Sequence, residues 1–454
     1  ADDLFPETQL QQGLDFAPER DRYGHVDIAA LIFALPQLQV AQTVAGQQHF
    51  MHWALEFADL FKARGGFDVV LGNPPWIKVE WNEQALLSDF DPRFAIRKLS
   101  ASDTARQREA VFAALPQARA DYLAECVATE GMGDFLNARQ NYPLLEGQKA
   151  NLYKCFLPLV WQVGSGVQAL LHQESPYDDP KAGLFRETIY KRLLAHYQFE
   201  NELQLFEIGG TRRYSFNIYG PDKNTIAFRN ISNIFHPATI GACYEHQGGG
   251  VTPGIKSEAG KWETLGHKNR ILEVDEALLS AFAQLYDEPG TPPRQARLPA
   301  VHSRELVSVL GKFAQASRRL GDLGDDVYFT QHWNESIGQK DGTIRRRGAS
   351  EQGYVSDATE FVLSGPHFYF GNPFSKTPRA VCTEKGHYDT LDLEALPDDY
   401  LPRSNYLPAC DAAEYASRVP RVSWVEEGEL EARAVTRYYR AISRRGLSIS
   451  GERT

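Results

Sequence analysis

The sequence has little of what marks several large classes of protein. Its 454 residues include only five cysteines, odd in number and widely spaced, which fits neither a disulfide framework nor a zinc site. The longest apolar run, 26–38, is shorter than the roughly 18 residues of a membrane-spanning helix. The first residues are acidic and lack the pattern of a signal peptide. We therefore expect a soluble, reduced, cytoplasmic protein.

An excess of basic residues is also missing, because 48 Lys and Arg face 59 Asp and Glu and the net charge is -11. The sum argues mildly against a nucleic-acid binder, but phosphate contacts are local. Three basic clusters lie in the last third of the chain: Arg318-Arg319, Lys340 with Arg345-Arg346-Arg347, and 433–445. Each cluster alone fits a solvated surface, whereas their common location favours a region that contacts an acidic partner.

What is present indicates an α/β protein of two to three domains. Strand-like and helix-like segments alternate over 66–230, which is typical of a sheet with helices on its faces. The predicted strands are 67–72, 167–172, 202–208 and 225–228, and the predicted helices are 151–162 and 184–196. We expect a helical lead-in over 1–65, an α/β part over 66–235, and a separate α+β domain over 236–454, where the alternation is lost.

The most informative motif is Asn73-Pro74-Pro75-Trp76, directly after the strand 67–72. Ligands of open α/β sheets bind beyond the carboxyl ends of strands. Two prolines remove backbone N–H donors, which leaves the Asn73 side-chain carbonyl and the Pro74 carbonyl as acceptors. Such acceptors suit a planar amino group and stabilise the positive charge that grows when its nitrogen attacks a methyl group. Trp76 can stack on a heterocycle; alternatively, the motif is a rigid turn with a core tryptophan.

The motif resembles that of the gamma-class N6-adenine DNA methyltransferases, in which Asn-Pro-Pro and an aromatic residue follow such a strand. The lead-in 52–57 is similar to that of large type IIG and phage-defence (BREX, DISARM) members. The segment 151–156, the glycines of 164–166 and the strands that follow match the order in that class. The resemblance covers about 50–230. Weaker likenesses to the target-recognition regions of large members lie at 333–335, 364–379 and 400–406.

The resemblance implies a partial Rossmann-like methyltransferase sheet over 66–235, followed by a mixed α+β target-recognition domain that binds double-stranded DNA. Asn73 to Trp76 would form the catalytic motif around a flipped adenine. Phe156 would contact S-adenosylmethionine and Phe216 would stack on the other face of the base, although Phe156 may equally be a core residue and Phe216 a loop aromatic. Arg345, Arg346 and Arg347 would contact phosphates. No metal ion is expected, and no nuclease motif is found.

The sequence departs from the family in one respect, because 1–66 contain no Gly-rich turn of the kind that a cofactor loop needs, and Gly13, Gly24 and Gly46 are isolated. We therefore expect that a companion chain, or an N-terminal half outside this sequence, carries the cofactor loop. Two other functions remain open. The same motif serves enzymes that methylate protein glutamine, and a DNA-binding subunit without turnover could keep the fold.

Overall fold

The computed structural model describes residues 21–97, 99–149, 151–316, 318–329, 334–348, 350–355, 360–363, 367–369, 372–373, 376–382 and 387–439. The chain divides into two compact units. The first comprises 1–196 and 215–228, and the second 197–214 and 229–454. Parts of the sequence likeness, namely 333, 364–366, 370–371 and 374–375, lie outside the described residues, as do Arg440, Arg444 and Arg445 of the last basic cluster.

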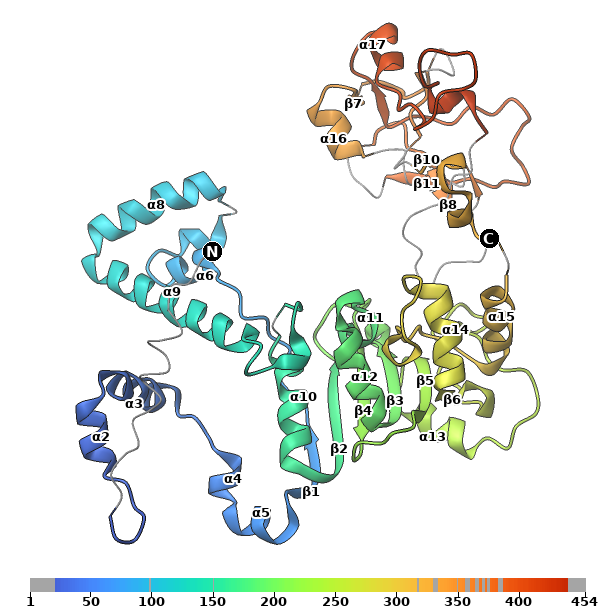
Figure 1. Cartoon of the computed structure of the whole chain (residues 1–454). Helices are drawn as coiled ribbons and strands as arrows, with labels where there is room; N and C mark the ends of the chain where they lie inside the picture. The colour runs from blue at the N-terminus through green and yellow to red at the C-terminus, as the bar shows by residue number, and fades with distance from the viewer. Residues whose placement is uncertain are drawn as a thin grey trace. The chain divides into compact units, whose positions relative to one another are not determined.

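A mixed sheet of six strands in the order β1-β2-β4-β3-β5-β6 forms the centre of an α/β fold, as predicted (Figure 1). Its strands are β1 Phe67–Gly72, β2 Gly164–Gln173, β3 Leu193–Glu200, β4 Arg213–Tyr219, β5 Ala227–Ile234 and β6 Leu272–Asp275. β1 pairs with β2 in parallel. The sheet continues past residue 235, so the prediction that the α/β pattern is lost there is wrong.

Two glycines allow the close approach of β1 and β2. A Cβ atom on Gly66 would collide with the carbonyl oxygen of Val163, and one on Gly166 with that of Asp68. Between Phe67 and Val69 the register shifts, which brings the backbones together at this point. The glycines of 164–166, predicted as a turn before the strand, are therefore the first residues of β2 itself.

Helix α10, Leu152–Val163, covers one face of this strand pair, and it confirms the helix predicted over 151–162 (Figure 1). Its apolar residues Leu157, Val160 and Val163 are buried. The Tyr153 ring stacks on the His172 ring of β2 with 5.5 Å between centroids. Because α10 begins next to the end of β1 in space, it also approaches the Asn-Pro-Pro-Trp segment.

Two predicted elements between residues 184 and 208 are corrected. α12 ends at Arg192, so the last residues of the predicted helix form β3. The predicted strand 202–208 is instead a short 3-10 helix, η3 Asn201–Leu203, and a turn. The Asn201 amide donates to the carbonyls of Phe206 and Ile208 at 2.9 and 2.8 Å, which fixes the turn. β3 was missed because a strand covered on both faces shows no alternation.

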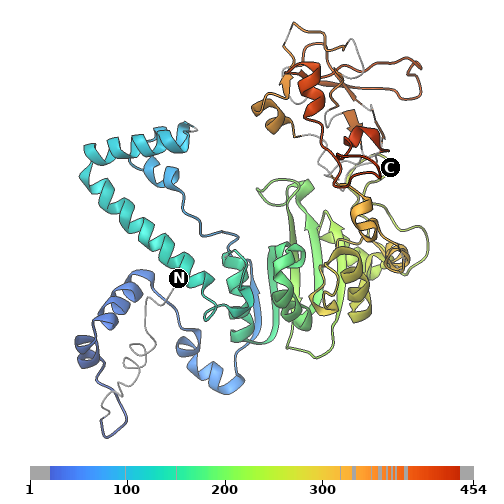
Figure 2. The same cartoon turned by 45° about the horizontal axis from the view of Figure 1, so that its top comes forward.

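The remaining helices of the first unit lie before α10 and between β2 and β3. They are α2 Ile28–Ala34, α3 Pro36–Gln48, α4 Trp53–Glu56, α5 Ala58–Arg64, α6 Glu83–Ser88, α7 Arg93–Ile96, α8 Ala101–Ala114, α9 Pro116–Asn137, η1 Pro143–Leu145, α11 Ser175–Asp178, η2 Pro180–Ala182 and α12 Gly183–Arg192. α8 and α9 form a two-helix hairpin in both views (Figures 1 and 2). A small core of Leu87, Phe94, Val111 and Ala118 packs beneath it.

The described part of the lead-in, 21–65, contains four short helices. Leu35 separates α2 from α3, which begins with Pro36, and His49 ends α3 in a left-handed conformation with φ 51°. Among the described residues no single helix is long and apolar enough to cross a membrane, and only the pair α2 and α3, bent by 114°, reaches that composition together.

The second unit adds helices around the end of the sheet and then mixes short strands with helices. It contains α13 Ala238–Glu245, η4 Lys268–Arg270, α14 Glu276–Tyr286, η5 Pro293–Gln295, α15 Arg304–Ala314, η6 Leu320–Asp326, α16 Glu335–Lys340, β7 Ile344–Arg346, β8 Phe368–Tyr369, β9 Asn372–Pro373, β10 Lys376–Pro378, β11 Tyr388–Thr390, β12 Tyr406–Pro408, α17 Ala412–Ser417 and η9 Val435–Arg437. Beyond the sheet this is the α+β composition that the sequence predicted.

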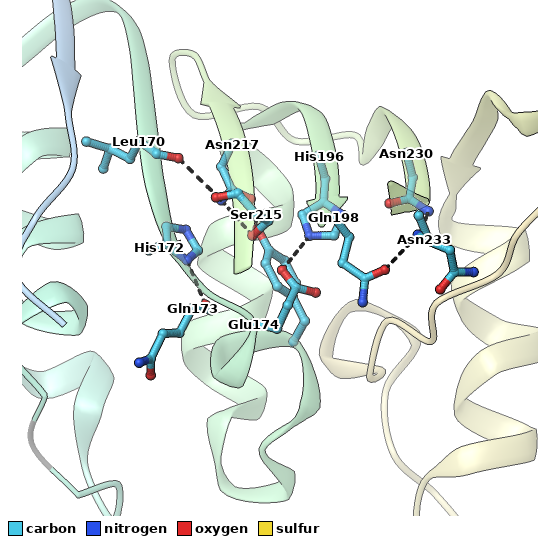
Figure 3. Close-up of polar contacts among 12 residues, drawn as sticks. Leu170, His172, Gln173, Glu174, His196, Gln198, Ser215, Asn217, Asn230 and Asn233 are labelled. Carbon is cyan, nitrogen blue, oxygen red and sulfur yellow. Dashed lines mark hydrogen bonds and ion pairs between the residues drawn. The ribbon is translucent and has the colours of Figure 1, made fainter. Parts of the chain in front are cut away.

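A buried polar network joins β2, β3 and β4 (Figure 3). The His196 Nε2 atom lies 3.0 Å from the Glu174 carboxylate, as Figure 3 shows. The His172 Nε2 atom lies 2.7 Å from the Tyr219 hydroxyl. Burial lowers the pKa of His172 to about 4. Burial alone would raise the pKa of Glu174, but its interactions with His196 outweigh this and lower it. At neutral pH His172 is therefore neutral and Glu174 is charged.

Because the pKa values of His172 and Glu174 are lowered in the folded state, we expect the free energy of unfolding to fall in mild acid. The unfolded state binds a proton at His172 below about pH 6.5, whereas the folded state does so only near pH 4. The free energy of unfolding should therefore fall by about 2 kcal/mol from this group between about pH 7 and about pH 4.5. Glu174 adds a loss in the same direction, because its folded pKa is also lowered.

Urea unfolding of the wild type and of His172→Asn at the two pH values measures this contribution. The variant should be less stable at neutral pH but should lose about 2 kcal/mol less on acidification. An equal loss in both proteins would mean that His172 does not titrate as its burial predicts.

Candidate active site

The Asn-Pro-Pro-Trp segment follows the carboxyl end of β1, as predicted. Pro74 is buried, whereas Asn73 and Pro75 are exposed. Neither the Asn73 side-chain oxygen nor the Pro74 carbonyl accepts a hydrogen bond from another described residue. The two acceptors that the sequence singled out are therefore open to an external donor, while the buried ring of Pro74 holds the backbone in place.

The segment is fixed to its neighbours at two points. The indole N–H of Trp76 donates to the carbonyl of Leu171 in β2, at 3.3 Å. The backbone N–H of Leu152, the first residue of α10, donates to the carbonyl of Ile77 at 2.9 Å. Trp76 is half-buried. The loop is thus held between β2 and α10.

Phe156 lies one helical turn after Leu152 and shares its face of α10. Its side chain is 36% exposed, whereas its neighbours Cys155 and Leu157 are buried. The alternative that Phe156 is a core residue is therefore wrong. Because Leu152 contacts Ile77, the exposed ring lies on the part of α10 that begins beside the motif. This position is compatible with the predicted cofactor contact, which stays a prediction.

Phe216 lies in the middle of β4 rather than in a loop. Its strand neighbours Ser215 and Asn217 are fully buried on the face of the network, so Phe216 points to the opposite face, half-buried. In the sheet β2 separates β4 from β1. The structure does not bring Phe216 to the motif as directly as Phe156, and its proposed contact with the base remains a prediction.

Lys154 is a residue of this region to which the sequence gave no role. It is buried on α10, where its ammonium group donates to Gln148 at 2.8 Å and lies 3.6 Å from the Asp179 carboxylate. Burial lowers its pKa, and Asp179 offsets part of this effect. The contacts tie the start of α10 to the segments before it and after β2. The signal was a lysine in an otherwise apolar helix.

The three predicted phosphate-binding arginines lie in the second unit, and they differ from one another. Arg345 makes a bidentate ion pair with Glu351, at 2.9 and 2.8 Å. Arg346 donates to the Cys382 carbonyl at 3.4 Å. Arg347 is only 6% exposed and donates to the carbonyls of Glu351, Ala380 and Arg379. The prediction that Arg347 contacts DNA is therefore wrong, because its donors are already used inside the fold.

The described parts of the chain contain no group of three or more His, Cys, Asp or Glu residues that could hold a metal ion. The loop of Gly248 to Gly250 follows a helix and not a strand. Within the described ranges, no Gly-rich turn joins the end of a strand to the start of a helix.

Comparison with known families gives a match over the part of the chain that holds the motif. Residues 27–105, which include β1 and Asn73 to Trp76, match the family model of the Eco57I restriction-modification methylase. None of the curated proteins matches the sequence. The family match covers less than half of the chain.

Three solved structures align with part of the chain. They are a DrdV–DNA complex (14% identity, TM-score 0.22, 39% of this chain and 16% of that chain), the M protein of the type I restriction enzyme EcoKI (13%, 0.22, 39% and 42%), and the ATP-dependent type ISP restriction-modification enzyme LlaBIII bound to DNA (10%, 0.20, 36% and 10%). The chain thus spans less than half the length of each.

The burial of Arg347 gives a prediction about stability. Replacing Arg347 with alanine leaves three carbonyls without donors and should lower the free energy of unfolding by about 3 kcal/mol. Arg345→Ala is the matched control, and it should cost less than about 1 kcal/mol because its ion pair is exposed. Calorimetry of both variants measures the difference. Unchanged stability of Arg347→Ala together with weaker DNA binding would restore the role predicted from the sequence.

Proposed function

We propose that this chain is the catalytic-motif and target-recognition portion of a DNA (adenine-N6) methyltransferase of a restriction-modification or phage-defence system. The observation that carries the proposal is the pair of open acceptors, the Asn73 side-chain oxygen and the Pro74 carbonyl, at the carboxyl end of β1. An exocyclic amine presents two N–H donors in one plane, which two neighbouring acceptors can bind. The family match over the same segment supports this proposal.

The residues of the chain would act on the amine before and during methyl transfer. Two accepted hydrogen bonds orient the nitrogen, and both become stronger as positive charge grows on it. Trp76, held by its bond to Leu171, offers a ring on which the base can stack. The adenine must leave the DNA stack to reach these groups, at a cost of a few kcal/mol. Phe216 would contact the other face of the base.

S-adenosylmethionine would supply the electrophilic methyl group. The described residues fit one side of this cofactor only. Phe156 offers an exposed ring beside the motif, but a Gly-rich turn for close backbone approach is not found in the described ranges. The proposal therefore includes a companion chain, or an N-terminal half outside this sequence, that would hold most of the cofactor. Phe156 would contact the cofactor from this chain.

Recognition of the DNA sequence would belong to residues 236–454. Arg345 and Arg346 remain candidates for phosphate contacts there, since both have exposed side chains, whereas Arg347 does not. Phosphate contacts fix the position of the duplex, and polar side chains that remain to be identified would read the base edges.

Transfer of labelled methyl groups from S-adenosylmethionine to unmethylated plasmid DNA tests the proposed function. The wild type, together with its cofactor-binding companion, should label the DNA, and Asn73→Ala should reduce the rate by at least about 100-fold. Because Asn73 is exposed, the variant should fold normally.

Asn73→Asp is the control, since it keeps an acceptor oxygen and should retain more activity than the alanine variant. If neither the chain alone nor the complex transfers label, yet the chain binds DNA, the chain is a binding subunit. If label enters a protein glutamine instead, the substrate class is wrong.

A further inference from the structure

β10 and β11 form a two-stranded antiparallel ribbon that pairs with no other described strand (Figure 1). Each strand has three residues, and so short a ribbon is marginally stable by itself. Contacts with other residues of the second unit must therefore hold it in place. The major groove of B-DNA admits an α-helix or a two-stranded ribbon of this kind.

Two arginine side chains bind the backbone where β10 ends. Arg347 donates to the carbonyls of Arg379 and Ala380, at 2.8 and 2.9 Å. Arg403 donates to the carbonyl of Pro378 at 3.3 Å. Three consecutive carbonyls are thus occupied, which fixes the backbone of 378–380. Because these partners carry no net charge, the positive charge of both guanidinium groups remains and favours the approach of a polyanion.

The side chains on this fixed backbone face solvent. The side chain of Arg379 is 54% exposed, and Val381 is 57% exposed. The Arg379 Nε atom donates to the carboxylate of Asp389 on β11 at 3.0 Å. The register pairs Thr377 with Asp389, so Arg379 and Asp389 are diagonal neighbours across the ribbon. The ribbon therefore presents an arginine whose orientation is set by its own second strand.

The ion pair leaves donors of Arg379 unused. Within the described ranges, its terminal nitrogens Nη1 and Nη2 form no hydrogen bond. The fork of a guanidinium group matches the O6 and N7 acceptors of guanine in the major groove, which is the commonest specific contact to a base. An exposed ion pair contributes little to stability. Its effect here is to restrict the Arg379 side chain, which lowers the entropy cost of binding.

A phosphate contact is the other role open to an exposed arginine, and Asp389 argues against it. Its carboxylate would repel a phosphate group, whereas it can accept a hydrogen bond from the amino group of cytosine. Arg379 and Asp389 together therefore match a G·C base pair. A phosphate contact fits Arg346 better, since this exposed residue lies beside the same segment, where it donates to the Cys382 carbonyl.

We propose that the ribbon of β10 and β11 enters the major groove of the target duplex and that Arg379 reads a guanine of the recognition sequence. Asp389 is the positioning residue that orients Arg379, and Arg347 fixes the backbone from which Arg379 extends. The inference rests on the proposed function, since a chain that methylates specific sites in DNA must read a base sequence.

Selection of duplexes from a random pool, followed by sequencing of the retained DNA, tests this assignment without methyl transfer. The full chain is used together with its companion. The wild type should enrich a sequence with guanine at one position, and Arg379→Ala should reduce the preference for that guanine at least about tenfold while the other positions stay specified. Asp389→Asn should also reduce this preference. It should nevertheless bind unrelated DNA at least as tightly as the wild type, because a repelling carboxylate is removed.

Arg421→Ala is the matched control. Arg421 is 57% exposed in the same unit and pairs with Glu431 at 3.0 Å, so the variant removes one positive charge elsewhere and should keep the recognition sequence. Salt dependence separates a base contact from a phosphate contact. Arg379→Ala should keep the slope of log K against log salt, whereas loss of a phosphate contact lowers it by about one. The variants change exposed side chains, and circular dichroism checks their folding.

Three results would overturn the reading role of Arg379. They are an unchanged recognition sequence with Arg379→Ala, an equal loss of affinity for all sequences with a lower salt slope, and the failure of the wild type to enrich any sequence. Asn73→Ala separates this proposal from the proposed function, because it should enrich the wild-type sequence but not transfer methyl groups. A guanine preference that depends on Arg379, without methyl transfer by the wild type, contradicts the function alone. Methyl transfer to the same sequence by the wild type and Arg379→Ala contradicts the reading role alone.

Discussion

The parallel pairing of β1 with β2 is the constraint on which the candidate site depends. Gly66 and Gly166 let the two backbones approach where the register shifts, and the pairing continues to Gly72 at the end of β1. The Asn-Pro-Pro-Trp loop starts at that end and is fastened to β2 through the Trp76 indole and to α10 through Ile77. A rigid loop with two open acceptors is the arrangement that electrostatic stabilisation of a reacting amine requires.

Behind the loop, a buried polar network and a buried lysine fix the elements that hold it. His172 and Glu174 join β2 to its neighbours (Figure 3), and Lys154 ties the start of α10 to Asp179. Buried charged groups of this kind are costly unless paired. Their presence around α10 and β2 fits a scaffold that positions Phe156 and Trp76.

The sequence predicted the parts of the fold whose signals are local. β1, β2 and α10 were found because an apolar run, a glycine break and a motif mark their ends. β3 was missed because its residues are buried on both faces, and the strand predicted over 202–208 is a turn held by Asn201. Burial of a strand on both faces and hydrogen bonds within a turn depend on the tertiary structure, and residue composition does not reveal them.

For the candidate site, too, the sequence predicted some features and missed others. The position of the loop directly after β1 follows from the motif and agrees with the structure, whereas the exposure of Asn73 is known from the structure alone. Arg347 was mistaken for a DNA contact because an arginine cluster looks alike whether its members face solvent or, like Arg347, donate to buried carbonyls. The roles of Phe156 and Phe216 depend on groups outside the chain, so neither the sequence nor the fold decides them.

The identity of the methylated nucleoside tests the central claim most directly. Plasmid DNA exposed to the chain, its companion and S-adenosylmethionine is digested to nucleosides and analysed by mass spectrometry. The account predicts N6-methyladenine in the wild-type sample and its loss with Asn73→Ala. Methylation of cytosine in place of adenine, or N6-methyladenine at equal levels with Asn73→Ala, would contradict it.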